Sequence, residues 1–241
     1  MSQSSNLPSL LEGLDFKVES TTKDIDFGLI TTMELVIMNA NKEKIGNVRL
    51  FLVPREVGRH GDYFDIMDAV NDDLSNYALA CANEKGFLHE HICTHNGTRR
   101  WERVDSKQIV YLDEIFVDEA LRGHGVGTWA INSLLKSCAN VMNMMVTSTA
   151  LPPHCVNELK LPGSALTAAQ RAFFENRAGD FFSKVGFRRL GNTQFLGLHK
   201  NPDHPSRNLA ASDDLPYQGG SHPVSDEALL RYIMGNPFAN R

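Results

Sequence analysis

The chain has 241 residues, of which 42% are hydrophobic and 8% aromatic, enough to bury a full core without disulfide or metal cross-links. Its 24 Lys and Arg against 29 Asp and Glu give a formal net charge of -5 with no long basic run, which argues against a specific nucleic-acid partner. The four cysteines lie far apart and form no CxxC pair, so we expect reduced thiols in an intracellular protein.

Neither the start of the chain nor its interior resembles a targeting or membrane segment. Residues 1–12 lack the basic and apolar stretches and the small-residue cleavage site of a secretory signal. No run approaches the roughly eighteen uninterrupted apolar residues of a membrane span, so we expect no membrane partner. We therefore expect a cytoplasmic protein, with the nucleus left open and the oligomeric state not determined by the sequence.

The first part of the chain predicts a hairpin and a helix. Residues 33–39 and 47–53 are two β-rich runs separated by a polar stretch and Gly46, which predicts an antiparallel pair of strands. Residues 63–82 place apolar side chains at helical intervals with acidic residues between them, which predicts one amphipathic helix.

The middle of the chain predicts a strand, a glycine turn and a helix. Residues 109–117 are apolar or β-branched except for Asp113 and Glu114, and they lead into the glycine cluster of residues 122–127. Residues 128–138 then carry an apolar stripe at helical spacing. Further along, the pattern predicts a strand over residues 141–149, a long helix over residues 166–185 with Gly186 as its left-handed cap, and one or two strands over residues 187–199.

The two ends of the chain are expected to lie outside the domain. Residues 201–224 are rich in Pro, Asp, Ser, Gly and His, which favours a flexible linker, and Ser225 is placed to cap a short helix that ends before Gly235. We predict an extension over residues 1–14, one domain over residues 15–200, and a linker with a C-terminal helix over residues 201–241. A tail of this kind is also a candidate segment for recruiting a partner protein.

The glycine cluster is the clearest chemical signal. Three glycines within five residues, between a strand and a helix, leave backbone N–H groups free to surround a phosphate at the positive end of the helix. The run is G-x-G-x-G, and no acidic residue lies between Glu119 and Glu158, so a dinucleotide-binding fold is not predicted. Gly127 is followed by Thr128 and Trp129 instead of Lys-Ser or Lys-Thr, which excludes a Walker-type loop.

The cluster instead resembles the acetyl-CoA loop of the GCN5-related N-acetyltransferase (GNAT) superfamily. That loop has Arg or Gln, two residues, Gly, one residue, and Gly or Ala, and Arg122, Gly125 and Gly127 match it. The preceding strand and the later run FFSKVGF at residues 181–187 also resemble the family, and the resemblance covers residues 16–199. It implies an α/β (α+β) GNAT-type acyl-CoA N-acyltransferase fold, with a mixed central sheet flanked by helices.

The resemblance also implies a cofactor site. Backbone groups of the strand would bind the pantetheine arm beside a β-bulge that opens the sheet, and an N–H of Phe116 or Val117 would stabilise the oxyanion. The residues expected to bind acetyl-CoA are Ile115, Phe116, Val117, Arg122, Gly123, His124, Gly125, Val126 and Gly127. Arg99 with Arg100, or Arg188 with Arg189, are candidates for the 3′-phosphate of CoA.

The implied reaction transfers the acetyl group to an amine by direct attack in a ternary complex. A free alkylamine is mostly protonated near neutral pH, so a carboxylate is needed to remove a proton. Asp113 stands where several family members carry their proposed base, and Glu114 is the second candidate. Without a bulge only one of these neighbours can face the site, and each has the alternative of a structural ion pair with Arg103, Lys107 or Arg188.

The chain departs from the family at two positions. Phe182 stands where many relatives carry a Tyr proposed to reprotonate the CoA thiolate, and Glu175 stands where they often have Asn. Ser183, Asn176 or water are the candidates that would replace these two side chains. The departures keep open an alternative function, a CoA-binding regulatory module without catalysis. The acceptor amine, small molecule or protein, is not identified by the sequence.

We predict no metal cofactor. His89, His91, Cys93 and His95 alternate as they would along one strand, but four ligands on one face of a strand would span about 20 Å, too far for one tetrahedral ion. Two of them together with a distant ligand are the alternative that the spacing leaves open.

Overall fold

The predicted hairpin is part of a larger sheet. The computed structural model describes residues 11–23, 28–54, 61–95, 98–99, 108–149 and 168–214. Its strands are β1 (Asp15–Lys23), β2 (Thr31–Met38), β3 (Lys44–Pro54), β4 (Thr94–His95), β5 (Thr98–Arg99), β6 (Gln108–Val117), β7 (Met144–Ser148), β8 (Arg188–Arg189) and β9 (Phe195–His199). Its α-helices are α2 (Tyr63–Asp68), α3 (Asp72–Cys81), α4 (Glu90–Cys93), α5 (Val126–Ser137) and α7 (Ala168–Val185).

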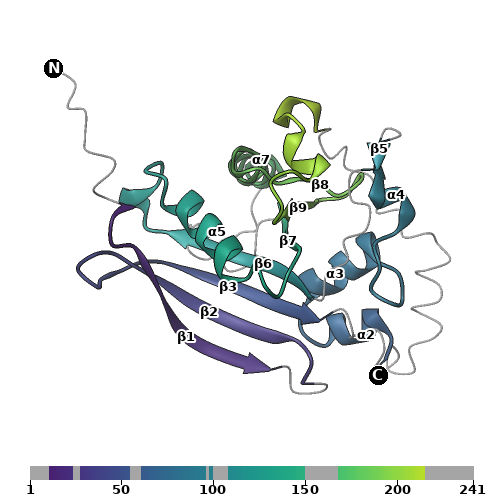
Figure 1. The fold of residues 1–241 in the computed structure, drawn as a ribbon, viewed down its shortest axis with the longest axis horizontal. Helices are drawn as coiled ribbons and strands as arrows, with labels where there is room; N and C mark the ends of the chain where they lie inside the picture. The colour runs from purple at the N-terminus through teal and green to yellow at the C-terminus, as the bar shows by residue number, and fades with distance from the viewer. Residues whose placement is uncertain are drawn as a thin grey trace.

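Seven strands form one mixed sheet in the order β1-β2-β3-β6-β7-β9-β8. All neighbouring pairs in it are antiparallel except β6 and β7, which run parallel with α5 as their crossover. The expected fold class is therefore confirmed: a mixed central sheet flanked by helices (Figure 1).

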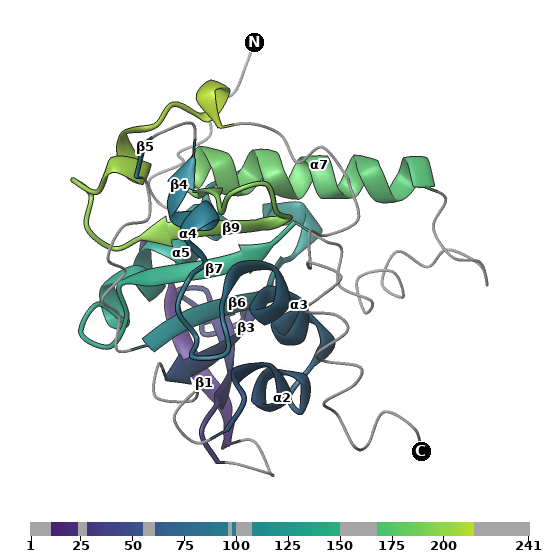
Figure 2. The ribbon, with the colours of Figure 1, turned by 90° about the vertical axis from the view of Figure 1, so that its right-hand side faces the viewer.

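Each face of the sheet packs on its own pair of helices. On one face, Phe51, Tyr111 and Val146 are buried against apolar side chains of α2 and α3. On the other face, Val110, Leu112 and Met145 are buried against side chains of α5 and α7. Figure 2 shows α2 and α3 on one side of β3 and β6, with α7 crossing above the sheet. Alternating residues of β6 thus belong to two different cores.

The expected single helix over residues 63–82 is wrong, because the chain forms two helices there. Asp62 caps α2 by accepting a hydrogen bond from the Phe64 N–H at 2.9 Å. Asn71 caps α3 in the same way, accepting from the Leu74 N–H at 2.8 Å. The helical spacing of apolar residues continues across Asn71, but its side chain caps a new helix there.

The first strand, β1, was not predicted. Most of its residues are exposed, and the alternation of apolar and polar residues in its sequence stops after Phe16 and Val18. One of its few inward contacts is Phe16, whose ring lies 5.1 Å from that of Trp129 on α5, centroid to centroid.

The predicted cap of the long helix is confirmed. Gly186 has a φ of 109°. Its N–H donates to the Ser183 carbonyl at 3.1 Å, and the N–H of Phe187 donates to the Phe182 carbonyl at 3.0 Å. These two bonds form a Schellman motif, which only a residue tolerant of positive φ closes without strain.

Residues 201–214 turn back onto the sheet, although the sequence predicted a flexible linker from residue 201. Their two short 3₁₀ helices are Pro205–Asn208 and Ala211–Asp213. Arg188 Nε donates to the Leu209 carbonyl at 2.7 Å, and the Arg189 N–H donates to Asp214 Oδ2 at 2.8 Å. The predicted C-terminal helix lies outside the described residues. Among the described ranges, no helix has the length and hydropathy needed to cross a bilayer.

Two stacked histidines connect this segment to β9. The ring centroids of His199 and His204 lie 3.9 Å apart, and the angle between the ring planes is 18°. His204 Nδ1 accepts a hydrogen bond from the Ser206 N–H at 3.3 Å and so caps the first 3₁₀ helix. Burial, with a smaller contribution from His199, lowers the pKa of His204 to about 4. The folded protein therefore favours the neutral imidazole.

This pKa predicts a pH dependence of stability. Between about pH 6.5 and pH 4 the unfolded chain binds a proton that folded His204 does not, so stability is lost as the pH falls through that window. His204→Asn keeps a capping acceptor but does not titrate. We expect the drop in the unfolding midpoint between pH 7 and pH 5 to be smaller in this variant than in the wild type. Equal drops would contradict the prediction.

Candidate active site

An extra residue in β6 lies at the centre of the site. Arg49 of β3 pairs with Glu114, but the next residue, Leu50, pairs with Leu112, so Asp113 has no partner of its own in this register. This is a β-bulge, which bends the strand and increases its twist. The family resemblance implied a bulge beside residues 115–117. The bulge in the structure lies two residues before this range in the chain, at Asp113.

The parallel pairing of β6 with β7 ends at the same point. The register runs from Ile109 with Met144 to Leu112 with Thr147, while β6 continues to Val117. The Thr147 hydroxyl donates to the Leu112 carbonyl at 2.9 Å and closes the ladder. Among the described residues, the pairing of β6 with β7 therefore ends five residues before β6 does.

A cavity of about 460 Å³ lies beside this end of β6. Its walls come from β6, the glycine loop, the first turn of α5 and the middle of α7. The lining residues are Ile115, Val117, Leu121, Arg122, Gly123, Gly125, Val126, Gly127, Thr128, Arg177, Ala178, Phe181 and Phe182. All the cofactor-binding residues expected from the sequence are therefore in this wall except Phe116 and His124.

The glycine loop has the backbone conformation that an anion site needs. Gly123 and Gly125 have φ angles of 80° and 87°, in the left-handed region. Gly125 is the N-cap of α5, and no side chain caps the helix there. The first N–H groups of a helix have no partner within it. In α5 these groups belong to the first turn, which lines the cavity. An added Cβ at Gly123 would meet no atom within 4 Å, which leaves the space over the loop open.

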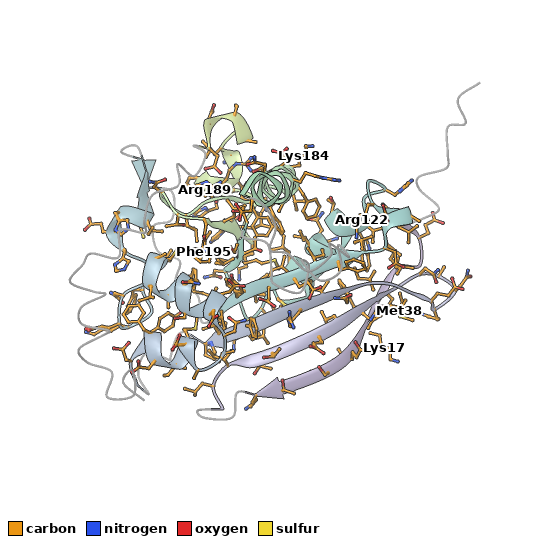
Figure 3. The ribbon with its side chains drawn as sticks, turned by 180° about the vertical axis from the view of Figure 1, so that it is seen from behind. Lys17, Met38, Arg122, Lys184, Arg189 and Phe195 are labelled. Carbon is orange, nitrogen blue, oxygen red and sulfur yellow. The ribbon has the colours of Figure 1, made fainter. Side chains whose placement is uncertain are left out.

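Arg122 is held at the edge of the cavity. Its Nε donates to the Val117 carbonyl at 2.8 Å, and its guanidinium carbon lies 5.2 Å from the centre of the Phe116 ring. Figure 3 shows Arg122 beside the start of α5. One positive charge is thus fixed next to the loop while the rest of the exposed guanidinium can bind an anion. The His124 ring, in contrast, contacts the Arg122 carbonyl at 3.0 Å.

Asp113 and Glu114 both bind Arg49, and their side chains are only 5% and 11% exposed. Arg49 Nε donates to Asp113 Oδ2 at 2.6 Å, and Arg49 Nη2 to Glu114 Oε2 at 3.4 Å. Asn47 Nδ2 also donates to Glu114 Oε1 at 3.3 Å. An ion pair was one expectation for these carboxylates, but Arg49 is a different partner from the three proposed.

These carboxylates lie on the opposite face of the sheet from the cavity. Leu112 and Ile115, on either side of them, pack with α5 and α7. The pKa of Tyr111, in the other core, is raised by burial and further by the charges of Asp73 and Asp113, so Asp113 lies near α3. The bulge turns both carboxylates to that face, where strict alternation would allow one.

Phe182 lies in the cavity wall on α7. Its side chain is buried, with ring centroids 5.1 Å from Phe181 and 5.2 Å from Phe187. Gly127 faces the same rings, and an added Cβ there would come within 3.0 Å of Phe181 Cζ. The missing side chain at Gly127 therefore lets α5 approach α7. The wall at Phe182 offers no hydroxyl to a ligand.

Several sequence expectations fall elsewhere. Arg188 Nη1 donates to the Ser183 carbonyl at 2.9 Å, and Arg189 Nη1 to the Thr193 carbonyl at 2.8 Å. Neither residue lines the cavity, so the proposed contact of this pair with a 3′-phosphate is not supported. Arg100, Arg103 and Lys107 lie outside the described residues, and the side chain of Arg99 is not described.

The histidine-rich segment is not the strand that the alternation indicated. Glu90–Cys93 is a short helix, and the rings of His89 and His91 stack 5.2 Å apart. Within the described ranges, no group of three or more His, Cys, Asp or Glu residues is placed to hold a metal ion.

Sequence reasoning missed Arg49 and Arg177. Arg49 stands between Val48 and Leu50 in an apolar strand, and a charge at such a position signals a buried partner. Arg177 lines the cavity from α7, opposite the glycine loop. Nothing in the local pattern distinguishes it from other charged residues of an amphipathic helix.

Residues 37–151 match the family model described as Acetyltransferase (GNAT) family. This segment belongs to the GNAT acetyltransferases. No curated protein matches the chain in sequence. The GNAT match includes β3, β6, the glycine loop, α5 and β7, and so contains Arg49 and both carboxylates. Helix α7, which forms the far wall of the cavity, lies beyond it.

Several solved structures have a low overall similarity to this chain. One is a mutant of the toxin AtaT bound to the C-terminus of the antitoxin AtaR and acetyl-CoA, with 12% identity, 78% of this chain and 93% of that chain covered, and a TM-score of 0.34. Another is arylalkylamine N-acetyltransferase 2 from Aedes aegypti, with 10% identity, coverages of 70% and 73%, and a TM-score of 0.36. A third is the Drosophila melanogaster polyamine N-acetyltransferase, with 13% identity, coverages of 73% and 77%, and a TM-score of 0.35.

Proposed function

We propose that this chain binds acetyl-CoA in the cavity and transfers the acetyl group to an amine. The observation that carries the proposal is the cavity that the glycine loop shares with the part of β6 beyond Leu112, where the recorded pairing with β7 has ended. The membership of residues 37–151 in an acetyltransferase family supports the same reaction.

The cavity fits the two chemical parts of the coenzyme. The N–H groups of the loop and the Arg122 guanidinium suit a pyrophosphate. The unpaired edge of β6 suits the amide groups of pantetheine, which can pair with a strand as a peptide does. Phe181, Ala178 and Ile115 supply an apolar wall for the arm between these ends.

The acceptor amine approaches from the α3 face in this proposal. Asp113 or Glu114 takes a proton from the protonated amine, and the neutral nitrogen then bonds to the thioester carbonyl carbon. The carbon–sulfur bond breaks, CoA leaves as a thiolate, and the second proton that the nitrogen loses passes through solvent to the thiolate. A backbone N–H of Phe116 or Val117 stabilises the oxyanion, a contact worth about 3 kcal/mol in other enzymes.

The experiment that tests this function is release of free thiol from acetyl-CoA in the presence of polyamines, aryl amines, amino sugars and peptides. We expect at least one acceptor class to be acetylated, with activity lost when Asp113 and Glu114 are replaced together by Asn and Gln. Binding of CoA without turnover on any acceptor would instead support the alternative function, a CoA-binding regulatory module. Phe182 is the observation that favours this alternative.

The phosphate site gives a separate prediction. Arg122→Glu places a negative charge at the edge of the cavity and should weaken CoA binding about tenfold or more, measured by calorimetry. The matched control is Lys17→Glu, which makes the same change of charge on exposed β1, away from Arg122 (Figure 3). Affinity unchanged in folded Arg122→Glu would remove the basis for the cofactor site.

A third prediction concerns the leaving group. If the absence of a hydroxyl at Phe182 limits departure of the thiolate, Phe182→Tyr supplies a proton donor in the cavity wall and kcat rises. Phe182→Leu keeps the wall apolar and should give no rise. Steady-state kinetics with the best acceptor check this, and a folded Phe182→Tyr with unchanged kcat would show that thiolate departure is not limiting.

A further inference from the structure

The segment before β1 lies against the glycine loop. Leu11 and Leu14 are partly buried and pack against the core that the sheet shares with α5 and α7. A Cβ added at Gly125, the N-cap of α5, would lie 3.7 Å from Leu11 Cδ1. Figure 1 shows this start of the described chain beside the loop that precedes α5. Leu11 is not one of the residues that line the cavity, so it lies against the loop from outside the site.

This segment is anchored to the tip of the hairpin between β2 and β3. Gly13 has a φ of 76°, and a Cβ added there would come within 2.9 Å of the Ala40 Cβ. A glycine is therefore needed for the chain to pass this close to the tip. Asp15 and Lys42 add an exposed ion pair at 3.7 Å, a contact of small energy. The close packing at Gly13 is thus the stronger of the two restraints.

The hairpin tip is itself held by Asn39. The Asn39 Oδ1 accepts hydrogen bonds from the N–H groups of Asn41 and Glu43, both at 2.9 Å. Its Nδ2 donates to Glu43 Oε2 at 2.8 Å, and its backbone N–H donates to the Glu43 carbonyl at 3.0 Å. The tip is therefore a well-defined support, and through Gly13 it determines where Leu11 meets the glycine loop.

The glycine loop has few restraints of its own. Gly123 and Gly125 both have positive φ, and no side chain caps α5 at Gly125. Arg122 restrains one side of the loop through its hydrogen bond to the Val117 carbonyl. Glycine loses more conformational freedom than any other residue when it is ordered, so contacts from elsewhere in the chain must offset that cost. Leu11 supplies such a contact at Gly125.

We propose that Leu11 is a positioning residue that holds the glycine loop in the conformation that binds the pyrophosphate of the coenzyme. This inference rests on the proposed binding of acetyl-CoA and extends the site to a residue outside the cavity wall. When a binding loop is competent for only part of the time, the apparent affinity falls by that fraction. Truncating Leu11 should therefore weaken coenzyme binding without removing any group that lines the cavity.

Calorimetry of CoA binding to the full chain tests this role. Leu11→Ala should raise Kd about fivefold, as expected if the loop is competent for about a fifth of the time. Leu11→Met keeps an apolar side chain of similar volume and should bring Kd back to within about twofold of the wild type.

The matched control for this measurement is Leu14→Ala. It makes the same truncation against the same core, but no atom of Leu14 lies within 4 Å of the Cβ position at Gly125. We expect Leu14→Ala to leave Kd within about twofold of the wild type. Equal weakening by Leu11→Ala and Leu14→Ala would overturn the proposal, because a general loss of core packing would then explain both.

Hydrogen exchange without any ligand separates loop positioning from general destabilisation. The Trp129 N–H donates to the Gly125 carbonyl at 2.9 Å in the first turn of α5, and the Cys138 N–H donates to the Leu134 carbonyl at 2.8 Å at the other end. Leu11→Ala should speed exchange of the Trp129 amide and leave that of the Cys138 amide unchanged. Equal acceleration of the two amides would contradict the proposal.

The two measurements distinguish failure of this inference from failure of the proposed function. A wild type that binds no CoA would contradict the proposed function, while exchange of the Trp129 amide would still decide whether Leu11 orders the loop. A wild type that binds CoA with an affinity unchanged by Leu11→Ala would leave the proposed function intact and overturn this inference.

Discussion

The extra residue in β6 is the constraint on which the site depends. A regular strand would continue its ladder with β7 and would send Asp113 and Glu114 to opposite faces of the sheet. The bulge at Asp113 stops the ladder at Leu112 and brings both carboxylates to one face. The same irregularity thus exposes a strand edge on one side and concentrates charge on the other.

Such a concentration of charge needs compensation inside the protein. Two carboxylates that are 5% and 11% exposed are costly to desolvate, and Arg49 reaches both from the neighbouring strand. The position of Arg49 is set by the register between β3 and β6, which places it opposite Glu114. Strand register therefore determines where the cation that compensates the two buried carboxylates lies.

Much of the central sheet could be predicted from the sequence, because its strands are continuous apolar runs punctuated by glycine. The hairpin of β2 and β3 and the strand before the glycine loop are of this kind. The Gly186 cap could be predicted because a glycine follows a long helical pattern. The sequence failed where polar side chains decide the outcome. Asn71 divides one predicted helix into two, and β1, at an exposed edge of the sheet, has an apolar alternation of only Phe16 and Val18. Arg49 was missed as the partner of the carboxylates because the pairing depends on strand register, which the bulge shifts by one residue.

The cavity is assembled from distant parts of the chain. Its near wall, the glycine loop and first turn of α5, precedes its far wall on α7 by about fifty residues, and α7 begins beyond the segment that matches the GNAT family. A nascent or partly unfolded chain that contains the complete loop would therefore still lack half of the enclosure. Occupancy by a ligand then reports completion of folding, and by mass action a ligand that binds only the finished enclosure shifts the equilibrium toward the native chain. The concentration of such a ligand would then affect the fraction of the chain that is folded.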